Sequence, residues 1–252
     1  MVSIDLKDAY YSVPISRKDR KYLRFLWQDT LFQFTCLPNG LSCAPRKFTK
    51  LLKPALSELH LRGHISSAYI DDMYLQGQTY KECVHNVIDS VTQIDSLGLV
   101  AHPEKSMFNP SQQLEFLGFI LNSVSMTIRL PLEKAAGLKM ACHALLTNPS
   151  PTIRELARVV GKVLSSFPGV THGPLHYRLL ECDKNLALQT TCWNFDKHMS
   201  LSLEAKSELS WWINNIVEAQ NILSRNAPTV TLTTDASKLG WGAVLGRTLV
   251  FH

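Results

Sequence analysis

Two adjacent acidic residues inside an apolar stretch constrain this chain more than any other feature. Asp71 and Asp72 follow Tyr69 and Ile70, with short apolar runs on either side. Such runs are typical of strands, so we expect the carboxylates at the tip of a hairpin, with Tyr69 and Asp71 on one face and Ala68 and Ile70 on the other. A solvated acidic turn is the simplest interpretation. Two like charges in a tight turn repel, however, and a divalent cation would remove that penalty.

The start of the chain supplies a third carboxylate. Residues 2–6 alternate between apolar and polar, which predicts a strand with Asp5 on its polar face. If this strand lies beside the hairpin, Asp5, Asp71 and Asp72 surround one small volume. Hard oxygen ligands of this kind suit Mg²⁺, and two such ions can drive an in-line displacement.

Four segments in a fixed order resemble the successive palm motifs of retroelement reverse transcriptases. They are residues 3–11, 37–45, 69–72 and 114–119. The sequences of residues 44–50 and 106–108 are most similar to those of the DIRS-type retrotransposons, which pair the polymerase with a tyrosine recombinase.

The resemblance implies an α+β fold: a right-hand polymerase palm with an antiparallel sheet backed by helices, a helical thumb or connection, and the opening hairpin of a ribonuclease H domain. The expected domains are residues 1–130, 131–226 and 227–252. From the pattern itself, helices are predicted over residues 80–97, closed by Gly98, and from Pro131 to about Leu146. Thr152 and Glu155 form a capping box at the start of another helix.

The same resemblance implies an RNA-directed DNA polymerase of a retrotransposon. Its partners would be an RNA or DNA template with a primer, and deoxynucleoside triphosphates. Asp5 and Asp71 would bind two Mg²⁺ or Mn²⁺ ions, and Asp72 would complete the carboxylate cluster. The sequence leaves the oligomeric state open.

Five further residues match the nucleotide-binding positions of the family. Asp8 and Ala9 would offer backbone N–H groups to the triphosphate. Tyr10 would lie under the sugar and exclude a ribose 2′-hydroxyl, although an ordinary core aromatic is the alternative. Asn39 and Gly40 would border the incoming nucleotide, with Asn39 where the family commonly carries Gln.

Two more roles come from the resemblance. Lys105 would protonate the pyrophosphate leaving group, and a surface lysine in a loop is the alternative. Leu117, Gly118 and Phe119, within a hairpin strand expected over residues 114–121, would form the primer grip that holds the primer 3′ end.

Basic residues occur in two groups. Arg154, Arg158 and Lys162 repeat every fourth residue, and residues 17–24 hold five more. A solvated face is one interpretation of each group, and contact with nucleic-acid phosphates is the other.

The last segment, residues 229–245, resembles the opening of a ribonuclease H domain, in which Asp235 matches the first metal-binding carboxylate. We expect a fragment, because the family's fingers would precede the first motif and the later nuclease carboxylates would follow the last residue. The alternative function is a catalytically incompetent transposon remnant that binds nucleic acid or a protein partner.

The composition of the chain limits the partners, metal sites and cellular locations that we expect for it. The net charge of +5 permits nucleic-acid contact without requiring it. The six cysteines form no C-x-x-C pair, so reduced intracellular thiols are expected, in the cytoplasm or the nucleus. His60/His64 and His172/His176 have helical spacing but contain intervening glycines and no third ligand, which argues against zinc. No apolar run has the length of a membrane span, and no signal peptide is visible.

Overall fold

The computed structural model describes residues 1–224, 230–238, 240–246 and 248–251, without the side chains of 248–251. The chain divides into two compact units, Met1–Asn221 and Ile222–His252, and each is described by itself. The predicted boundary at residues 226–227 lies outside the described residues, so the domain limits stay a prediction.

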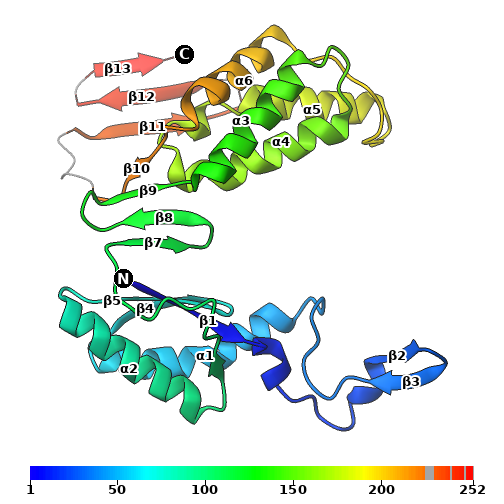
Figure 1. Ribbon diagram of the computed structural model, residues 1–252. Helices are drawn as coiled ribbons and strands as arrows, with labels where there is room; N and C mark the ends of the chain where they lie inside the picture. The colour runs from blue at the N-terminus through cyan, green and yellow to red at the C-terminus, as the bar shows by residue number, and fades with distance from the viewer. Residues whose placement is uncertain (225–229, 239, 247, 252) are drawn as a thin grey trace. The chain divides into compact units, whose positions relative to one another are not determined.

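A four-stranded antiparallel sheet forms the first part of the larger unit. Its order is β4-β5-β1-β6 (Figure 1). The strands are β1 (Val2–Lys7), β4 (Ile65–Tyr69), β5 (Asp72–Gln76) and β6 (Val100–Ala101). Two short 3₁₀ helices, η1 (Ala9–Ser12) and η2 (Arg20–Tyr22), and a separate hairpin of β2 (Arg24–Trp27) and β3 (Thr30–Gln33) follow β1.

Two helices, α1 (Ala44–Leu61) and α2 (Tyr80–Ser96), cover one face of this sheet. The buried side chains of β1 and β5 form one core with Phe48 of α1 and Val87 of α2, and Figure 1 shows both helices on the same side of the strands. The predicted helix over residues 80–97 is confirmed: the Thr79 side chain caps it, and Gly98 follows at φ +74°.

A second sheet has the order β10-β9-β8-β7, in which β7 pairs with β8 and β8 with β9 in the antiparallel direction. Its strands are β7 (Gln113–Phe116), β8 (Phe119–Asn122), β9 (Thr127–Arg129) and β10 (Asn221–Ile222). The expected single strand over residues 114–121 is wrong, because Leu117 and Gly118 both have positive φ and form a tight turn between β7 and β8.

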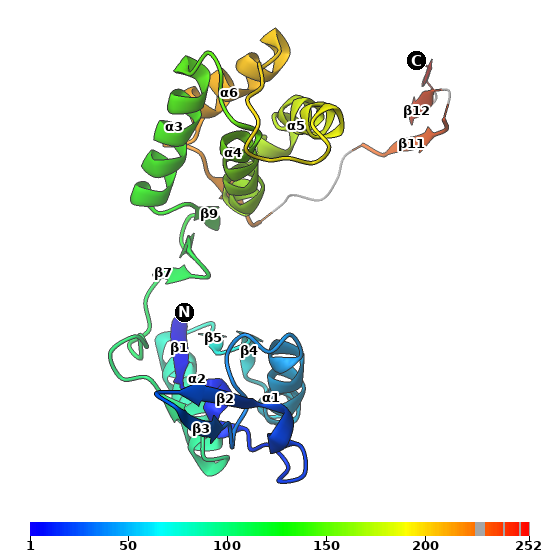
Figure 2. The ribbon, with the colours of Figure 1, turned by 90° about the vertical axis from the view of Figure 1, so that its right-hand side faces the viewer.

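Four helices make up the rest of the larger unit, packed against one another in Figures 1 and 2. They are α3 (Leu132–Thr147), α4 (Ile153–Ser166), α5 (Arg178–Thr190) and α6 (Leu203–Asn215), with the 3₁₀ helices η3 (Phe167–Gly169) and η4 (Gly173–Leu175) between α4 and α5. Both predictions hold here: α3 begins after Pro131, and Thr152 and Glu155 form the capping box. Trp212 is fully buried in the helical core, and its Nε1 donates to the His176 carbonyl.

The smaller unit contains an antiparallel sheet of β11 (Leu232–Ala236), β12 (Trp241–Leu245) and β13 (Thr248–Phe251). The first residue of the predicted 229–245 segment lies outside the described residues. All six cysteines are free thiols. No helix among the described residues combines the length and hydrophobicity needed to cross a membrane.

Candidate active site

Strand β1 places Asp5 on the open face of the first sheet. Val2, Ile4 and Leu6 are at most 2% exposed and face the helices, whereas Asp5 is half-buried on the opposite face. Asp5 lies directly opposite Asp72 on β5. The alternation of β1 therefore determines both its core side and its acidic side.

The turn of the β4–β5 hairpin supplies the second and third carboxylates. Ile70 and Asp71 form the turn, Asp72 is the first residue of β5, and the Leu6 N–H donates to the Asp71 carbonyl at 2.9 Å. The prediction that the carboxylates lie at a hairpin tip is confirmed. The expected alternation through Ile70 and Asp71 is wrong, because the strand stops at Tyr69.

The turn also contains backbone strain. Ile70 has φ +60°, in the left-handed region that a β-branched side chain strongly disfavours. Ile70 packs against the core of the first sheet, which compensates for this conformation. Strained residues of this kind cluster at functional sites, where the surrounding structure holds them in place.

A pocket of about 320 Å³ opens beside this turn. Seven predicted site residues line it: Asp5, Asp8, Ala9, Tyr10, Asn39, Asp71 and Lys105. Asp72 and Gly40, which were predicted with them, are not among its lining residues. The pocket thus brings together residues from β1, η1, the loop before α1, the hairpin turn and the loop after β6.

The carboxylates interact electrostatically. The pKa of Asp72 is raised, first because burial removes the carboxyl from water and then because Asp71 and Asp5 are negative neighbours. Lys105 acts in the opposite direction and lowers this pKa. A cation bound at this point would relieve the same repulsion.

Tyr10, an aromatic residue that lines the pocket, is affected by the same negative charge. The pKa of Tyr10 is raised by burial first and then by Asp71 and Tyr69. The Tyr10 ring packs edge-on against Phe48 at 5.7 Å between centroids, which fixes its orientation. Asp8, immediately before η1, has φ +51°.

The donor set suits a hard divalent cation, because it consists of carboxylate oxygens with repelling charges. Within the residues that the structure describes, however, no three His, Cys, Asp or Glu side chains are already gathered as a metal cluster. This holds for the two histidine pairs as well as for Asp5, Asp71 and Asp72.

Four lining residues were not predicted as site residues, namely Leu6, Lys7, Tyr11 and His102, and two of them make polar contacts there. His102 lines it, its N–H donates to the Asp5 carbonyl at 2.7 Å, and its Nδ1 atom is buried without a hydrogen-bond partner. The Tyr11 hydroxyl accepts from Asn39 Nδ2 at 3.3 Å. Only the position of His102 beside Lys105 and of Tyr11 beside Tyr10 could have indicated them.

The predicted primer-grip residues lie in the β7–β8 hairpin. Leu117 and Gly118 occupy its turn and Phe119 begins β8. Phe116, which precedes the turn, packs against Tyr74 of β5 with 5.5 Å between ring centroids. The grip segment is thereby connected to the strand that begins with Asp72.

The basic stripe on α4 is not uniform. Arg154 forms a two-point ion pair with Asp196, at 2.7 and 3.1 Å, and is therefore already paired. Arg158 and Lys162 instead border a pocket of about 430 Å³ between α3 and α4. Of the three residues, these two are better placed for contact with a ligand.

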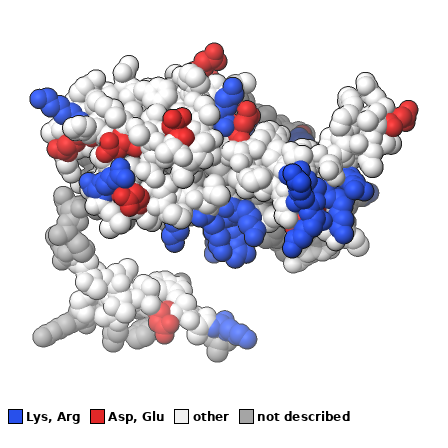
Figure 3. Space-filling model, turned by 90° about the horizontal axis from the view of Figure 1, so that it is seen from below, with Lys and Arg blue, Asp and Glu red and all other residues white. Residues whose placement is uncertain are grey.

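Figure 3 shows groups of Lys and Arg side chains on the underside of the larger unit. Exposed basic residues are densest in residues 17–24 and in residues 46–53 of α1. Eight of them form no ion pair with another described residue: Arg17, Lys18, Lys21, Arg24, Arg46, Lys47, Lys50 and Lys53. No ion pair with a described acidic side chain therefore neutralises their positive charge.

In the smaller unit, Asp235 lies opposite Gly242, and its Oδ1 accepts the Ala236 N–H at 2.9 Å. It is exposed and lines a pocket of about 500 Å³ made by β11 and β12. Its metal-binding role remains a prediction.

Comparison with known proteins identifies the family. Residues 1–121 match the family described as "Reverse transcriptase (RNA-dependent DNA polymerase)". Residues 1–121 belong to this family. The matched region contains the pocket, the acidic hairpin and the first two strands of the second sheet.

The relatives of this chain are longer polyproteins, of which it spans about a tenth. The Gag-Pol polyprotein of Rous sarcoma virus subgroup C (strain Prague) is 24% identical over 215 residues, which cover 79% of this chain and 12% of the relative. The Transposon Tf2-3 polyprotein of Schizosaccharomyces pombe is 27% identical over 124 residues, which cover 49% of this chain and 9% of the relative. The DIRS-type assignment remains a prediction.

Solved structures support the fold. A foamy viral protease-reverse transcriptase in complex with an RNA/DNA hybrid matches 99% of this chain and 32% of its own, with a TM-score of 0.71 and 20% identity. The same type of enzyme in complex with double-stranded DNA matches 99% of this chain and 49% of its own, with a TM-score of 0.68 and 20% identity. The α+β polymerase fold expected from the sequence is confirmed.

Proposed function

We propose that this reverse transcriptase acts as an RNA-directed DNA polymerase, which adds a deoxynucleotide to a primer 3′-hydroxyl and releases pyrophosphate. One observation carries the proposal: seven residues predicted separately from four chain segments line one pocket beside the acidic hairpin. Nucleic-acid partners are supported by the RNA/DNA hybrid and the double-stranded DNA with which the similar enzymes form complexes.

In the proposed reaction, Asp5, Asp71 and Asp72 would hold Mg²⁺ or Mn²⁺. When bound, such ions supply charge neutralisation at the attacking and leaving oxygens. The carboxylates would hold the ions at the reacting centre, and the transition state of phosphoryl transfer depends mainly on positioning and electrostatics.

The remaining pocket residues would bind the nucleotide. The backbone N–H groups of Asp8 and Ala9 would contact the triphosphate, and Tyr10 would lie under the sugar and exclude a 2′-hydroxyl. Asn39, fixed by Tyr11, would border the base. Lys105 would donate its proton to the pyrophosphate as the bond to the α-phosphorus breaks.

Other parts of the chain would hold nucleic acid. We propose that the Leu117–Gly118 turn and Phe119 contact the primer, and that Arg158 and Lys162 contact the duplex backbone. Asp235 would belong to a ribonuclease H-like unit. The protein would act inside the cell, where the template and the triphosphates occur.

Primer extension on a primed RNA template tests the polymerase. Asp71→Asn should reduce the rate by on the order of 10²-fold or more, because it removes a charge at the reacting centre. Asp95→Asn, an exposed acidic residue on α2, is the matched control and should retain activity. Activity of Asp71→Asn near that of the unmodified chain would contradict the proposal.

A second candidate function is a transposon remnant that binds nucleic acid or a protein partner without catalysis. It is favoured by the exposed basic residues of segment 17–24 and α1 that form no ion pair with another described residue, because contact with nucleic-acid phosphates needs no catalytic step. Binding of the primed template by the unmodified chain, without extension in Mg²⁺ or Mn²⁺, would support it.

A further inference from the structure

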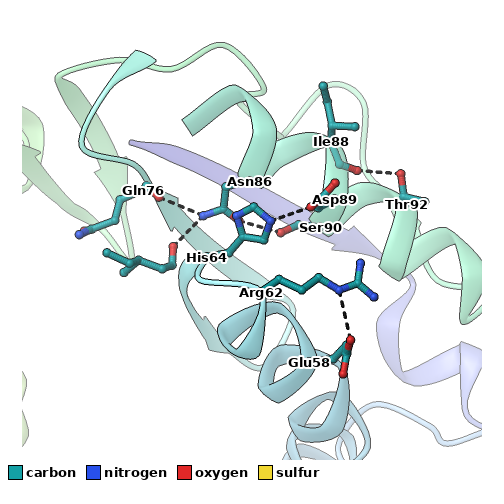
Figure 4. A network of polar contacts seen from close by, with 10 residues as sticks. Glu58, Arg62, His64, Gln76, Asn86, Ile88, Asp89, Ser90 and Thr92 are labelled. Carbon is teal, nitrogen blue, oxygen red and sulfur yellow. Dashed lines mark hydrogen bonds and ion pairs between the residues drawn. The ribbon is translucent and has the colours of Figure 1, made fainter. Parts of the chain in front are cut away.

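Helix α2 contacts the acidic hairpin at the end opposite its carboxylates. Ile65 and Gln76 are the last paired residues at the open end of β4 and β5. The Asn86 side chain of α2 lies between their backbones: its Nδ2 donates to the Ile65 carbonyl at 2.8 Å and to the Gln76 carbonyl at 3.0 Å (Figure 4). One amide group thus joins both strands, with one N–H for each.

The orientation of this amide is determined by its partners. Ser90, one turn later on α2, donates its hydroxyl to Asn86 Oδ1 at 3.1 Å. The opposite orientation would place the amide oxygen against two carbonyl oxygens. Asn86 is 1% exposed and Ser90 is fully buried, so water cannot replace these bonds.

Two neighbouring contacts hold the same end of the hairpin. His64, immediately before β4, pairs with Asp89 of α2 through Nε2 and Oδ2 at 2.7 Å (Figure 4). Gly77, immediately after β5, lies so close to α2 that a Cβ atom would come within 2.8 Å of the Glu82 carbonyl carbon. The helix therefore contacts both strands where they leave the sheet.

The hairpin needs this support because β4 is an edge strand. In the order β4-β5-β1-β6, β5 is held by β1 as well, whereas β4 has only β5 as a neighbour among the described strands. Five residue pairs separate the open end from the turn, roughly 15 Å at the usual rise per residue. A shift at the open end would therefore move the turn that contains Asp71.

We infer that Asn86, oriented by Ser90, is a positioning residue of this active site. It fixes the open end of the β4–β5 hairpin and so keeps Asp71 and Asp72 in register with Asp5. The inference rests on the proposed function for the role of these carboxylates. It concerns a side chain that touches neither the pocket nor the acidic turn.

Hydrogen exchange of the full chain tests the hairpin directly. Asn86→Leu leaves two buried carbonyls without donors, and exchange over residues 65–76 should accelerate about tenfold or more while exchange in α3 and α4 stays unchanged. Ser90→Ala should accelerate exchange over the same residues by a smaller factor. This variant serves for the test if Asn86→Leu does not fold. Ser166→Ala, which removes another buried serine hydroxyl on α4, is the matched control.

Titration of the same proteins with Mn²⁺ provides a reading that a purely structural role would not change. The metal concentration at half-saturation should rise roughly tenfold in Asn86→Leu and less in Ser90→Ala, and remain unchanged in Ser166→Ala. Unchanged exchange over residues 65–76, or faster exchange with unchanged metal affinity, would overturn the inference. If the unmodified chain binds no Mn²⁺, the proposed function fails, and hydrogen exchange alone decides whether Asn86 fixes the hairpin.

Discussion

Asp5 and Asp72 lie directly opposite each other on neighbouring antiparallel strands. This register depends on the apolar side of β1, because a slip by one residue would turn Val2, Ile4 and Leu6 away from the core. The hydrophobic core therefore determines which two carboxylates meet. Their repulsion is a stability cost that the sheet tolerates.

Raising the pH should destabilise the metal-free chain through Asp72. Its pKa is raised in the folded state by burial, Asp71 and Asp5, so the folded chain binds the proton more tightly than the unfolded chain. The contribution of Asp72 to stability is greatest below its unfolded pKa, near 3.8, and is lost as the pH rises through the folded pKa. Urea unfolding in a chelator, measured across this window, checks the sign.

Asp72→Asn is the corresponding variant. It should remove that pH dependence and stabilise the metal-free chain by up to about 1 kcal/mol at neutral pH, because a like-charge pair across the strands disappears. The same loss of stability with rising pH in the variant as in the unmodified chain would show that Asp72 is not the group responsible.

Adding Mg²⁺ should stabilise the folded chain by binding only the folded state. At about ten times the dissociation constant the gain is roughly 1.4 kcal/mol, or about 3–6 °C in the melting temperature of a protein of this size. Calorimetry with and without a chelator measures it. Asp5→Asn should abolish the shift, whereas Asp95→Asn should keep it.

Binding to an RNA/DNA hybrid should depend on salt through Arg158 and Lys162. Each change to Ala should reduce the log-log salt slope by about 0.7–0.9, because one phosphate contact is lost. Arg154→Ala serves as the internal comparison, since Arg154 is paired with Asp196 and its removal should leave the slope almost unchanged. Equal losses for all three residues would contradict this distinction.

Leu117→Asn should stabilise the chain and weaken its hold on a primer. Leu117 is 46% exposed and has φ +48°, a conformation that costs leucine about 1–2 kcal/mol and suits an Asn-Gly turn. Unfolding in urea should show a gain of about 1 kcal/mol, and affinity for a primed template should fall. Val124→Asn, at an exposed turn position without positive φ, should give neither effect.

Local patterns account for the parts of the fold that were predicted correctly. The alternation of residues 2–6 predicts β1 and its acidic face, because strand periodicity follows from backbone geometry. Helical periodicity before Gly98 predicts α2, and the Thr152–Glu155 capping box predicts the start of α4. Both signals depend only on residues that are neighbours along the chain. The family motifs added the grouping of the pocket residues, which no local pattern contains.

Contacts between distant segments decided the rest. Arg154 is paired because Asp196, 42 residues away, lies beside it. His102 lines the pocket because its N–H continues the pairing next to Asp5. The ion pair of Arg154 has no signal in the surrounding sequence, and His102 has only its position near Lys105, since each contact depends on where another segment packs.

The amino-acid sequence by itself determined strand β1, helix α2, the starts of α3 and α4, and the acidic residues from which the site is built, because periodicity and capping act over a few neighbouring residues. Only the tertiary structure decided that Asp71 but not Asp72 lines the pocket, that Arg154 is paired, and that Asn86 joins β4 to β5. These outcomes depend on packing between segments, where burial makes each unmet hydrogen bond costly and so selects one arrangement.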